Sequence, residues 1–380
     1  MAPFVALGRN EPAAPLRSAL IRRASQGYLN CLRGRRRPLS FVLAKIQLLW
    51  WMLILDQCYR SLTSSGKTGD PFSLTRNPNG RVLVARAMGG IGDLLMMEPG
   101  LEANAIRYRQ PVDFAIPRKF FPIFEHNPHV NLIDIDGPPI DISTYRRFFN
   151  LSQCPATRYE SPRVPEIKKG RVETFAQGMQ VSRNRLLKQG WRINHFLSTD
   201  DEIFCDDFLK RHGIGKAGGG KRPLVGVQPF SRDSYKDHPN IAEMIRAIAK
   251  DNDVLIFHHV ANGLPEGEGI VTTAGLPLGH SLALVSRIEA MVSVDSAFLH
   301  AASAFDVPVV ALFGPTDART LTRHHRRVKT LWRQDNFACV PCWRNEDKAC
   351  AVSGLRSVSP CMAAIRTDEV LSALGEMLAT

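Results

Sequence analysis

The chain has 380 residues, of which 44% are hydrophobic and 22% charged, and its formal net charge is +13. This composition predicts packed globular domains, two to three of them at roughly 150 residues each, and excludes a wholly disordered chain. Because no apolar run reaches the roughly 20 residues that a membrane-spanning helix needs, the sequence also excludes a polytopic membrane protein.

The positive charge is concentrated in residues 1–79, which hold 12 Lys and Arg against 3 Asp and Glu. Such an arm suits an anionic partner such as lipid headgroups, lipopolysaccharide phosphates or nucleic acid, although a solvated extension has the same composition. Residues 41–55 are apolar except for Lys45 and Gln47. We interpret them as a helix that lies on a membrane surface or packs on the body, and we expect peripheral membrane contact through residues 20–60.

Regular structure is predicted from residue 81 onward. Residues 82–85 form a short apolar strand, followed by a glycine turn and a helix over 94–109 that Pro99 interrupts. Two more strands are expected at 112–116 and 130–135. This alternation of strand and helix predicts a parallel sheet covered by helices.

A second unit of the same kind follows Gly218-Gly219-Gly220. Its strands are expected at 224–227, 254–258, 290–294 and 307–313, and its helices at 241–250, 281–288 and 297–305. We therefore predict an α/β chain with a basic helical extension (1–79), an N-terminal Rossmann-like domain (80–218) and a C-terminal Rossmann-like domain (219–380). Two doubly wound domains leave a cleft between their facing strand ends, where ligands usually bind.

The first motif is Gly89-Gly90-Ile91-Gly92-Asp93, directly after a strand. Glycines there let the backbone approach a ligand, so Gly92 is a candidate contact. A dinucleotide fingerprint would need a third glycine where Leu95 stands. Asp93 at the strand end is a candidate general base, and a helix N-cap is the alternative that spacing alone favours.

The second motif, residues 228–236, also follows a strand and contains Ser231 and Lys236. A hydroxyl and a compact ammonium suit phosphate oxygens, whereas an ordinary polar loop is the alternative. The third motif starts at Asp295-Ser296-Ala297, where a strand ends and a helix begins, and includes His300 one turn later. A helix N-terminus attracts a diphosphate, although Asp295 could instead be a cap and His300 a core histidine.

Taken in order, the three motifs resemble the heptosyltransferase-type glycosyltransferases of family 9, over about residues 81–375. The resemblance implies a GT-B fold, in which two Rossmann-like domains face a cleft and the C-terminal one holds the donor nucleotide. It implies inverting transfer of a sugar from a nucleotide-sugar donor, ADP-heptose, to a hydroxyl of a lipopolysaccharide core or another surface glycan. A protein side chain is the alternative acceptor.

The resemblance also implies roles for particular residues. Asp93 would be the catalytic base, and Ser231 and Lys236 would contact the donor diphosphate. The residues that match the family's Asp-Thr/Ser-Gly-x-x-His donor motif are Asp295, Ser296, Ala297 and His300, with Ala297 in place of the usual glycine.

Four of the eight cysteines lie close together near the C-terminus: Cys339, Cys342, Cys350 and Cys361. Four thiolates with a close first pair can enclose a tetrahedral zinc or iron ion, which would be structural rather than catalytic. A similar cluster occurs in many family members. Four reduced thiols or a redox pair are the alternatives.

Asp134-Ile135-Asp136 has the D-x-D pattern of a metal–nucleotide site of the other large glycosyltransferase fold. Because it ends an apolar strand, we interpret it as strand-end polarity and expect catalysis to need no cofactor and no divalent metal.

Two other classes of protein share parts of this pattern. A nicotinamide-dependent oxidoreductase on tandem Rossmann domains is disfavoured by the missing third glycine. A nucleic-acid binder would need a basic cysteine finger, yet Arg344 and Lys348 flank Glu346 and Asp347. We therefore expect no nucleic-acid partner and a cytoplasmic enzyme, peripheral on the inner membrane face.

Overall fold

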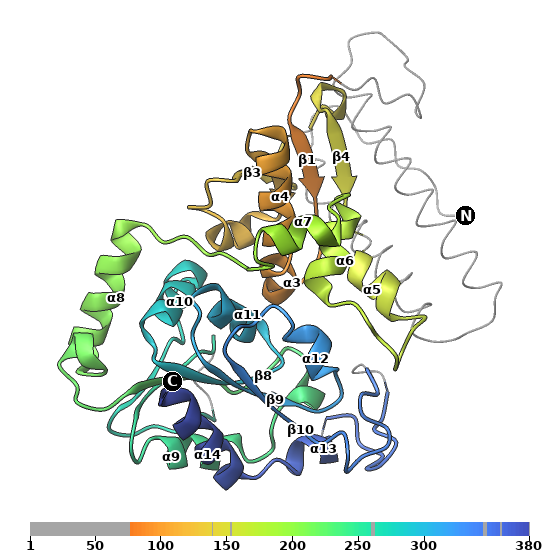
Figure 1. The fold of residues 1–380 in the computed structure, drawn as a ribbon. Coiled ribbons are helices and arrows are strands. Elements are labelled where there is room, and N and C mark those ends of the chain that lie inside the picture. Colours follow the sequence, from red (N-terminus) through yellow and green to blue (C-terminus); the bar gives the residue numbers. More distant parts are fainter. Residues whose placement is uncertain are drawn as a thin grey trace, which may run out of the picture. The chain divides into compact units, whose positions relative to one another are not determined.

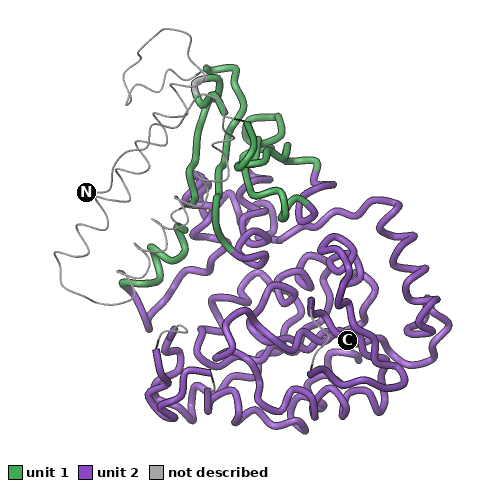
Figure 2. Tube along the Cα trace, turned by 180° about the vertical axis from the view of Figure 1, so that it is seen from behind, with its two compact units in different colours: residues 1–89, 104–121, 128–162 green, residues 90–103, 122–127, 163–380 purple. Residues whose placement is uncertain are grey.

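The computed structural model describes residues 77–379, except 139, 153, 260–262, 345–347 and 358. The proposed membrane contact through residues 20–60 lies outside the described residues. The described chain divides into two compact units (Figure 2). The first unit takes 77–89, 104–121 and 128–162, and the second takes 90–103, 122–127 and the chain from 163 onward. The units are interleaved in sequence, whereas the predicted domains are contiguous, so their boundaries at 80–218 and 219–380 stay predictions.

The first unit contains a four-stranded parallel sheet in the order β3-β2-β1-β4 (Figure 1). Every residue of β1 and β2 is buried, and apart from Asp113 in β2 all of these residues are apolar. Strand β4 was not predicted, because its sequence Arg-Phe-Phe-Asn follows a Pro-rich stretch without apolar alternation. The strands are β1 Val82–Ala85, β2 Val112–Ile116, β3 Val130–Asp134 and β4 Arg147–Asn150.

The second unit contains a six-stranded parallel sheet in the order β10-β9-β8-β5-β6-β7. Numbered within the sheet, this is the 3-2-1-4-5-6 order of dinucleotide-binding folds, and the order reverses between β5 and β8. The four strands predicted in this unit are confirmed within two residues at each end, while β7 and β10 were missed. The strands are β5 Leu224–Gln228, β6 Asp253–Ile256, β7 Ile270–Thr272, β8 Ala290–Val294, β9 Val309–Phe313 and β10 Val328–Trp332.

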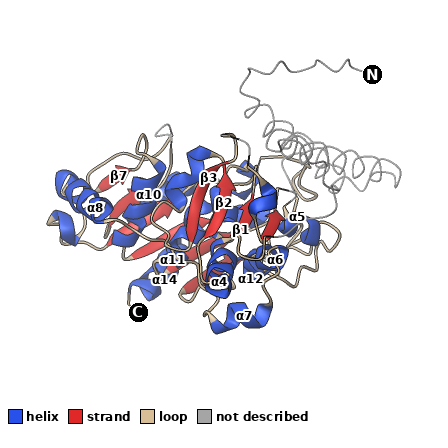
Figure 3. Ribbon diagram, turned by 90° about the horizontal axis from the view of Figure 1, so that it is seen from above, coloured by secondary structure: helices blue, strands red, loops and turns tan. Residues whose placement is uncertain are grey.

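Helices pack on both faces of this second sheet. Helices α9 (Ile241–Ile248) and α14 (Thr367–Leu378) lie on one side of β8–β10, and α10 (Leu278–Leu284) and α11 (Ala297–Ala304) lie on the other (Figure 1). In α9 the buried residues recur with helical spacing, so one apolar stripe faces the sheet. Helices and strands alternate along both units (Figure 3). The predicted α/β class with two parallel sheets is confirmed.

The helix expected over 94–109 is two helices, α3 (Ile91–Leu95) and α4 (Glu98–Tyr108). Pro99 stands in the first turn of α4, where its missing N–H costs no helical hydrogen bond. The break is therefore where proline predicts it, but the first helix begins inside the glycine motif, at Ile91.

The part of the chain between β4 and β5 contains four helices, α5 to α8, which were not predicted. Helix α8 (Thr199–His212) has a full capping box between Ser198 and Asp201 and ends at Gly213, whose φ is 63°. No helix among the described residues is both long and apolar enough to cross a bilayer. The other helices are α5 Pro155–Glu160, α6 Arg171–Gly178, α7 Arg183–Lys188, α12 Ala318–Leu321 and α13 Pro360–Ala363, and the 3-10 turns are η1 Arg118–Ile123, η2 Ile142–Thr144, η3 Lys216–Gly218, η4 Ser234–Lys236 and η5 Val285–Arg287.

Candidate active site

Two of the predicted donor residues meet where the strand order of the second sheet reverses. Lys236 ends the turn η4 in the loop after β5, and Asp295 directly follows β8. These two strands pair directly, with Gln228 opposite Ser293. Ligands of open parallel sheets bind outside the carboxyl ends of the strands at such a switch point. The topology therefore brings together residues that are distant in sequence.

Asp295 and Lys236 form a buried ion pair. The Oδ2 atom of Asp295 lies 3.2 Å from Nζ of Lys236 and accepts a 2.9 Å hydrogen bond from the Thr316 hydroxyl, which follows β9. Burial alone would raise the pKa of Asp295, but the charges of Lys236, His300 and Arg171 outweigh it and hold that pKa below its usual value. Burial would likewise lower the pKa of Lys236, but the charge of Asp295 raises it. Both groups are therefore charged at neutral pH.

Ser231 shapes the loop that carries Lys236. Its hydroxyl oxygen accepts a 3.1 Å hydrogen bond from the N–H of Asp233, and its own N–H donates over 2.7 Å to Oδ1 of Asp237. Burial raises the pKa of Asp237 to about 6, although this N–H and the charge of Lys236 oppose the rise. A contact between Ser231 and the diphosphate stays a prediction, since its polar atoms already serve the loop.

The helix after Asp295 begins without a side-chain cap. Ser296 is the N-cap residue of α11, and its side chain makes no capping hydrogen bond. Asp295 is not a cap, so that alternative is wrong. The first-turn N–H groups, starting at Ala297, carry the positive partial charge of the helix end, which favours an anion such as a diphosphate.

His300 lies one turn into α11 and is 3% exposed. Burial lowers its pKa to about 4, and the neighbouring Asp295 offsets only part of that effect. Its Nδ1 lies 3.3 Å from Nε2 of His324. His300 is thus a neutral imidazole in contact with a second one, which the sequence motif did not indicate.

Asp93 lies in the first turn of α3, and the N-cap of that helix is Gly90, so Asp93 is not the cap that spacing favoured. Its Oδ1 accepts a 3.1 Å hydrogen bond from Nη1 of Arg171, at the start of α6. The two side chains are 16% and 27% exposed, respectively. No motif in the sequence marked Arg171, because its partner lies in a distant segment.

Gly92 is required by the packing of α3 against α11. A Cβ atom at this position would lie 2.9 Å from Cδ2 of His300 and 3.5 Å from Cα of Ala297. The first distance is too short for a real contact, so a side chain here would displace the His300 ring, and glycine lets the two helices approach. This assigns Gly92 a packing role, whereas its predicted donor contact stays untested.

These side chains form one electrostatic group within the second unit. The charges of Asp295, Arg171, Asp93 and Lys236 all act on the pKa of His300. The group offers a carboxylate that can accept a proton and two cations that can stabilise an anionic leaving group. Arg171, Thr316 and His324 are the members that sequence reasoning missed; only Thr316, at a strand end, carried a usable signal.

The four cysteines of the cluster are all free thiols. Burial, followed by the charges of the neighbouring Cys342, Cys339 and Cys350, raises the pKa of Cys361 to about 12. Backbone N–H groups donate to the sulfur of Cys350 and hold its pKa below the usual value against burial. However, three of the sulfurs do not come within 4.8 Å of one another, and among the described residues only three histidines form such a group.

The segment that carries the cysteines, residues 339–361, contacts the loop that carries Lys236. The Arg344 guanidinium donates to the Ser359 hydroxyl over 2.8 Å and lies 4.8 Å from the ring centroid of Tyr235. Ser359 in turn donates to the carbonyl of Tyr235. The segment therefore contacts the residue next to Lys236 in sequence.

The D-x-D pattern is a strand end. Asp134 is the last residue of β3, and its Oδ1 accepts a 3.0 Å hydrogen bond from the N–H of Asp136. This local turn is consistent with the interpretation as strand-end polarity.

Comparison with known protein families finds a match within the second unit. Residues 198–352 match the family model for glycosyltransferase family 9 (heptosyltransferase). This region includes Ser231, Lys236 and the Asp295–His300 motif. No curated protein sequence matches the chain.

Solved structures show the same fold. The ADP-heptose lps heptosyltransferase II of E. coli is 18% identical with a TM-score of 0.56, covering 79% of this chain and 98% of its own. The iron-containing dodecameric glycosyltransferase TibC from enterotoxigenic E. coli H10407 is 15% identical with a TM-score of 0.59, covering 80% of this chain and 77% of its own. A second TibC structure, in complex with ADP-D-beta-D-heptose, is 14% identical with a TM-score of 0.57, covering 83% of this chain and 80% of its own. The resemblance stated from the sequence is confirmed: residues 198–352 carry the match to glycosyltransferase family 9 (heptosyltransferase), on the GT-B-like fold of solved heptosyltransferases.

Proposed function

We propose that this chain is an inverting transferase that moves heptose from ADP-heptose to a hydroxyl of a lipopolysaccharide core or another surface glycan. The observation that carries the proposal is the buried Asp295–Lys236 pair at the switch point of the second sheet, beside the uncapped start of α11. A fixed cation and a helix N-terminus together suit the diphosphate of a nucleotide sugar. The TibC complex with ADP-D-beta-D-heptose supports this choice of donor.

In the proposed reaction Asp93 removes the proton of the acceptor hydroxyl, and the oxygen attacks the anomeric carbon of the donor. The bond from that carbon to the diphosphate oxygen breaks on the opposite face, so one displacement inverts the centre. Arg171 orients the Asp93 carboxylate through its 3.1 Å hydrogen bond. Lys236 and the N–H groups of α11 stabilise the negative charge that collects on the departing diphosphate.

With these protein cations at the site, we expect transfer to proceed without added Mg²⁺ or Mn²⁺. Turnover that appears only on adding either ion would contradict this part of the proposal.

The cysteine segment supports a second acceptor class, a protein side chain. A similar cysteine cluster occurs in many members of the family that the sequence resembles, and TibC, which shares this fold, is iron-containing. Thiolate donors suit zinc or iron, but the sulfurs do not gather in the described structure as metal ligands do. A structural metal held by Cys339, Cys342, Cys350 and Cys361 stays a prediction, and binding it would require the four sulfurs to move closer together.

The decisive test is Asp93→Ala, assayed with ADP-heptose by mass spectrometry against both a lipid-A-core acceptor and protein acceptors. We expect turnover to fall by about 10²–10⁴-fold, the usual contribution of a general base, while calorimetry shows unchanged ADP affinity. Asp206→Ala, in an exposed ion pair with Arg287, is the matched control and should keep full turnover. Near-normal turnover of the Asp93 variant would refute the assignment.

A further inference from the structure

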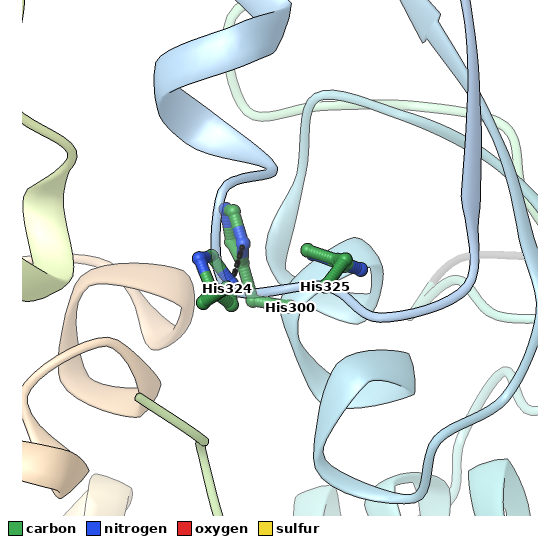
Figure 4. A group of neighbouring side chains, drawn as sticks. All are labelled: His300, His324 and His325. Carbon is green, nitrogen blue, oxygen red and sulfur yellow. Dashed lines mark hydrogen bonds between the residues drawn. The ribbon is translucent and has the colours of Figure 1, made fainter. Parts of the chain in front are cut away.

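A cluster of three histidines lies in the second unit outside the charged pairs already described. His300 comes from α11, and His324 and His325 follow α12 in the segment leading to β10 (Figure 4). Each ring offers one nitrogen, and these three atoms lie within 4.8 Å of one another. Among the described residues, no other group of three His, Cys, Asp or Glu side chains has ligand atoms this close together.

The spacing is close to that of a metal site. The His300 Nδ1 to His324 Nε2 distance is 3.3 Å. Two nitrogens on a tetrahedral metal, each at about 2.0–2.1 Å, are separated by about 3.3 Å, so this pair already stands at the right distance. His325 offers its nitrogen within 4.8 Å of both.

The third ring gives an independent indication of a missing ligand. Both ring nitrogens of His325 are shielded from solvent and have no hydrogen-bond partner. Buried polar groups are normally satisfied, because leaving one unpaired costs about 1–3 kcal/mol. An ion bound by one of these nitrogens would satisfy it.

Charge around the cluster does not exclude a cation. The segment contains several arginines, but the Arg326 guanidinium pairs with Asp306 and the Arg323 guanidinium donates to the carbonyl of Lys168. Near His300 the carboxylates of Asp295 and Asp93 are matched by the cations Arg171 and Lys236. The charges around this ligand are therefore balanced and not uniformly positive.

We propose that His300, His324 and His325 bind one divalent transition-metal ion of the zinc, iron or cobalt type. Three neutral imidazoles suit these metals and leave a fourth position for water. The ion would hold the segment after α12 against α11. The inference does not depend on the transferase proposal, because it concerns metal occupancy and not turnover.

The test is Co²⁺ titration of the metal-stripped full chain, followed by visible spectroscopy. The double variant Cys339→Ser/Cys342→Ser provides a background without the cysteine site, and it separates the two proposals. We expect one equivalent of Co²⁺ to bind with ligand-field bands and without thiolate charge-transfer absorption. His324→Ala and His325→Ala should each weaken this binding by roughly 100-fold, at least as much as losing a second-shell partner of a metal ligand.

His212→Ala, which removes an exposed histidine at the end of α8, is the control and should bind Co²⁺ normally. If a variant fails to fold, the wild-type spectrum still decides: absorption from thiolate ligation alone, or no stoichiometric binding, overturns the proposal. Unchanged affinity in folded His324→Ala and His325→Ala would overturn it as well, since His300 and His324 would then form only a hydrogen-bonded pair.

Discussion

The two ion pairs of the site, Asp295–Lys236 and Asp93–Arg171, differ in which elements carry them and in how exposed they are. Asp295 and Lys236 come from loops after neighbouring strands and are 9% and 16% exposed. Asp93 and Arg171 come from the starts of two short helices and are more exposed, at 16% and 27%. A buried pair fixed by a sheet is suited to permanent charge at a binding site, whereas a more accessible carboxylate is suited to exchanging a proton with substrate.

The largest effect is expected from breaking the buried pair with Asp295→Asn. This leaves the Lys236 ammonium buried without its main counter-charge, which typically costs about 3–5 kcal/mol of unfolding free energy. We expect chemical denaturation to show this loss and calorimetry to show lost ADP binding. Asp206→Asn, which breaks an exposed pair, should change stability by less than about 0.5 kcal/mol. If Asp295→Asn and Asp206→Asn lowered stability equally, the buried pair would be no more important to the fold than the exposed one.

Gly92→Ala tests the packing that places Asp93. The added Cβ would stand 2.9 Å from the buried ring of His300, so we expect a loss of about 1–3 kcal/mol and a displaced α3. Turnover should then fall more than donor affinity. Gly90→Ala is the matched control, since nothing lies within 4 Å of a Cβ there and its φ is −92°. A stable, fully active Gly92→Ala enzyme would contradict this account.

Acid should weaken the buried pair specifically. The folded pKa of Asp295 lies below the unfolded value of 3.8, so its contribution to stability is present above about pH 4 and is lost as the pH falls through the folded pKa. The stability difference between wild type and Asp295→Asn, measured by urea unfolding across acidic pH, should therefore shrink toward low pH. If the difference in unfolding free energy stayed constant with pH, the charge of the Asp295 carboxylate would not be what stabilises the fold.

The smallest effect is expected from Ala297→Gly, which restores the glycine usual in this motif. Glycine in a helix costs about 0.5–1 kcal/mol relative to alanine, and less at the first position. We expect donor affinity to change by no more than about threefold. A gain of tenfold or more in calorimetry would instead show that the alanine methyl group narrows the donor site.

Much of the fold could be predicted, because the buried parallel strands consist mainly of apolar residues. Residues 82–85, 112–116 and 290–294 coincide with strands to the residue. Strand β4 and helix α8 were not predicted, for different reasons. Strand β4 lacks the apolar pattern of a buried strand. Helix α8 does carry a start signal in the sequence, the capping box of Ser198 and Asp201, but no helix was predicted from it.

The candidate site divides in the same way. Asp93, Lys236, Asp295 and His300 were candidates because each follows a predicted strand, which is where parallel sheets present functional groups. Their roles came from the resemblance to glycosyltransferase family 9, since the local pattern alone favoured a helix cap at Asp93. The donor contact predicted for Gly92 stays a prediction, and the structure adds that this residue packs against His300. That contact joins segments about 200 positions apart, which local patterns cannot register.

The sequence by itself determined the α/β class, the strand ends that carry Lys236 and Asp295, and the glycine motif before Asp93. Only the tertiary structure decided that Arg171 holds Asp93, that Thr316 bonds to Asp295, and that His324 and His325 gather beside His300. The physical reason is that periodicity and turn chemistry act over a few residues, whereas ion pairs and metal-ligand groups form between side chains that only strand order and helix packing bring within about 3–5 Å.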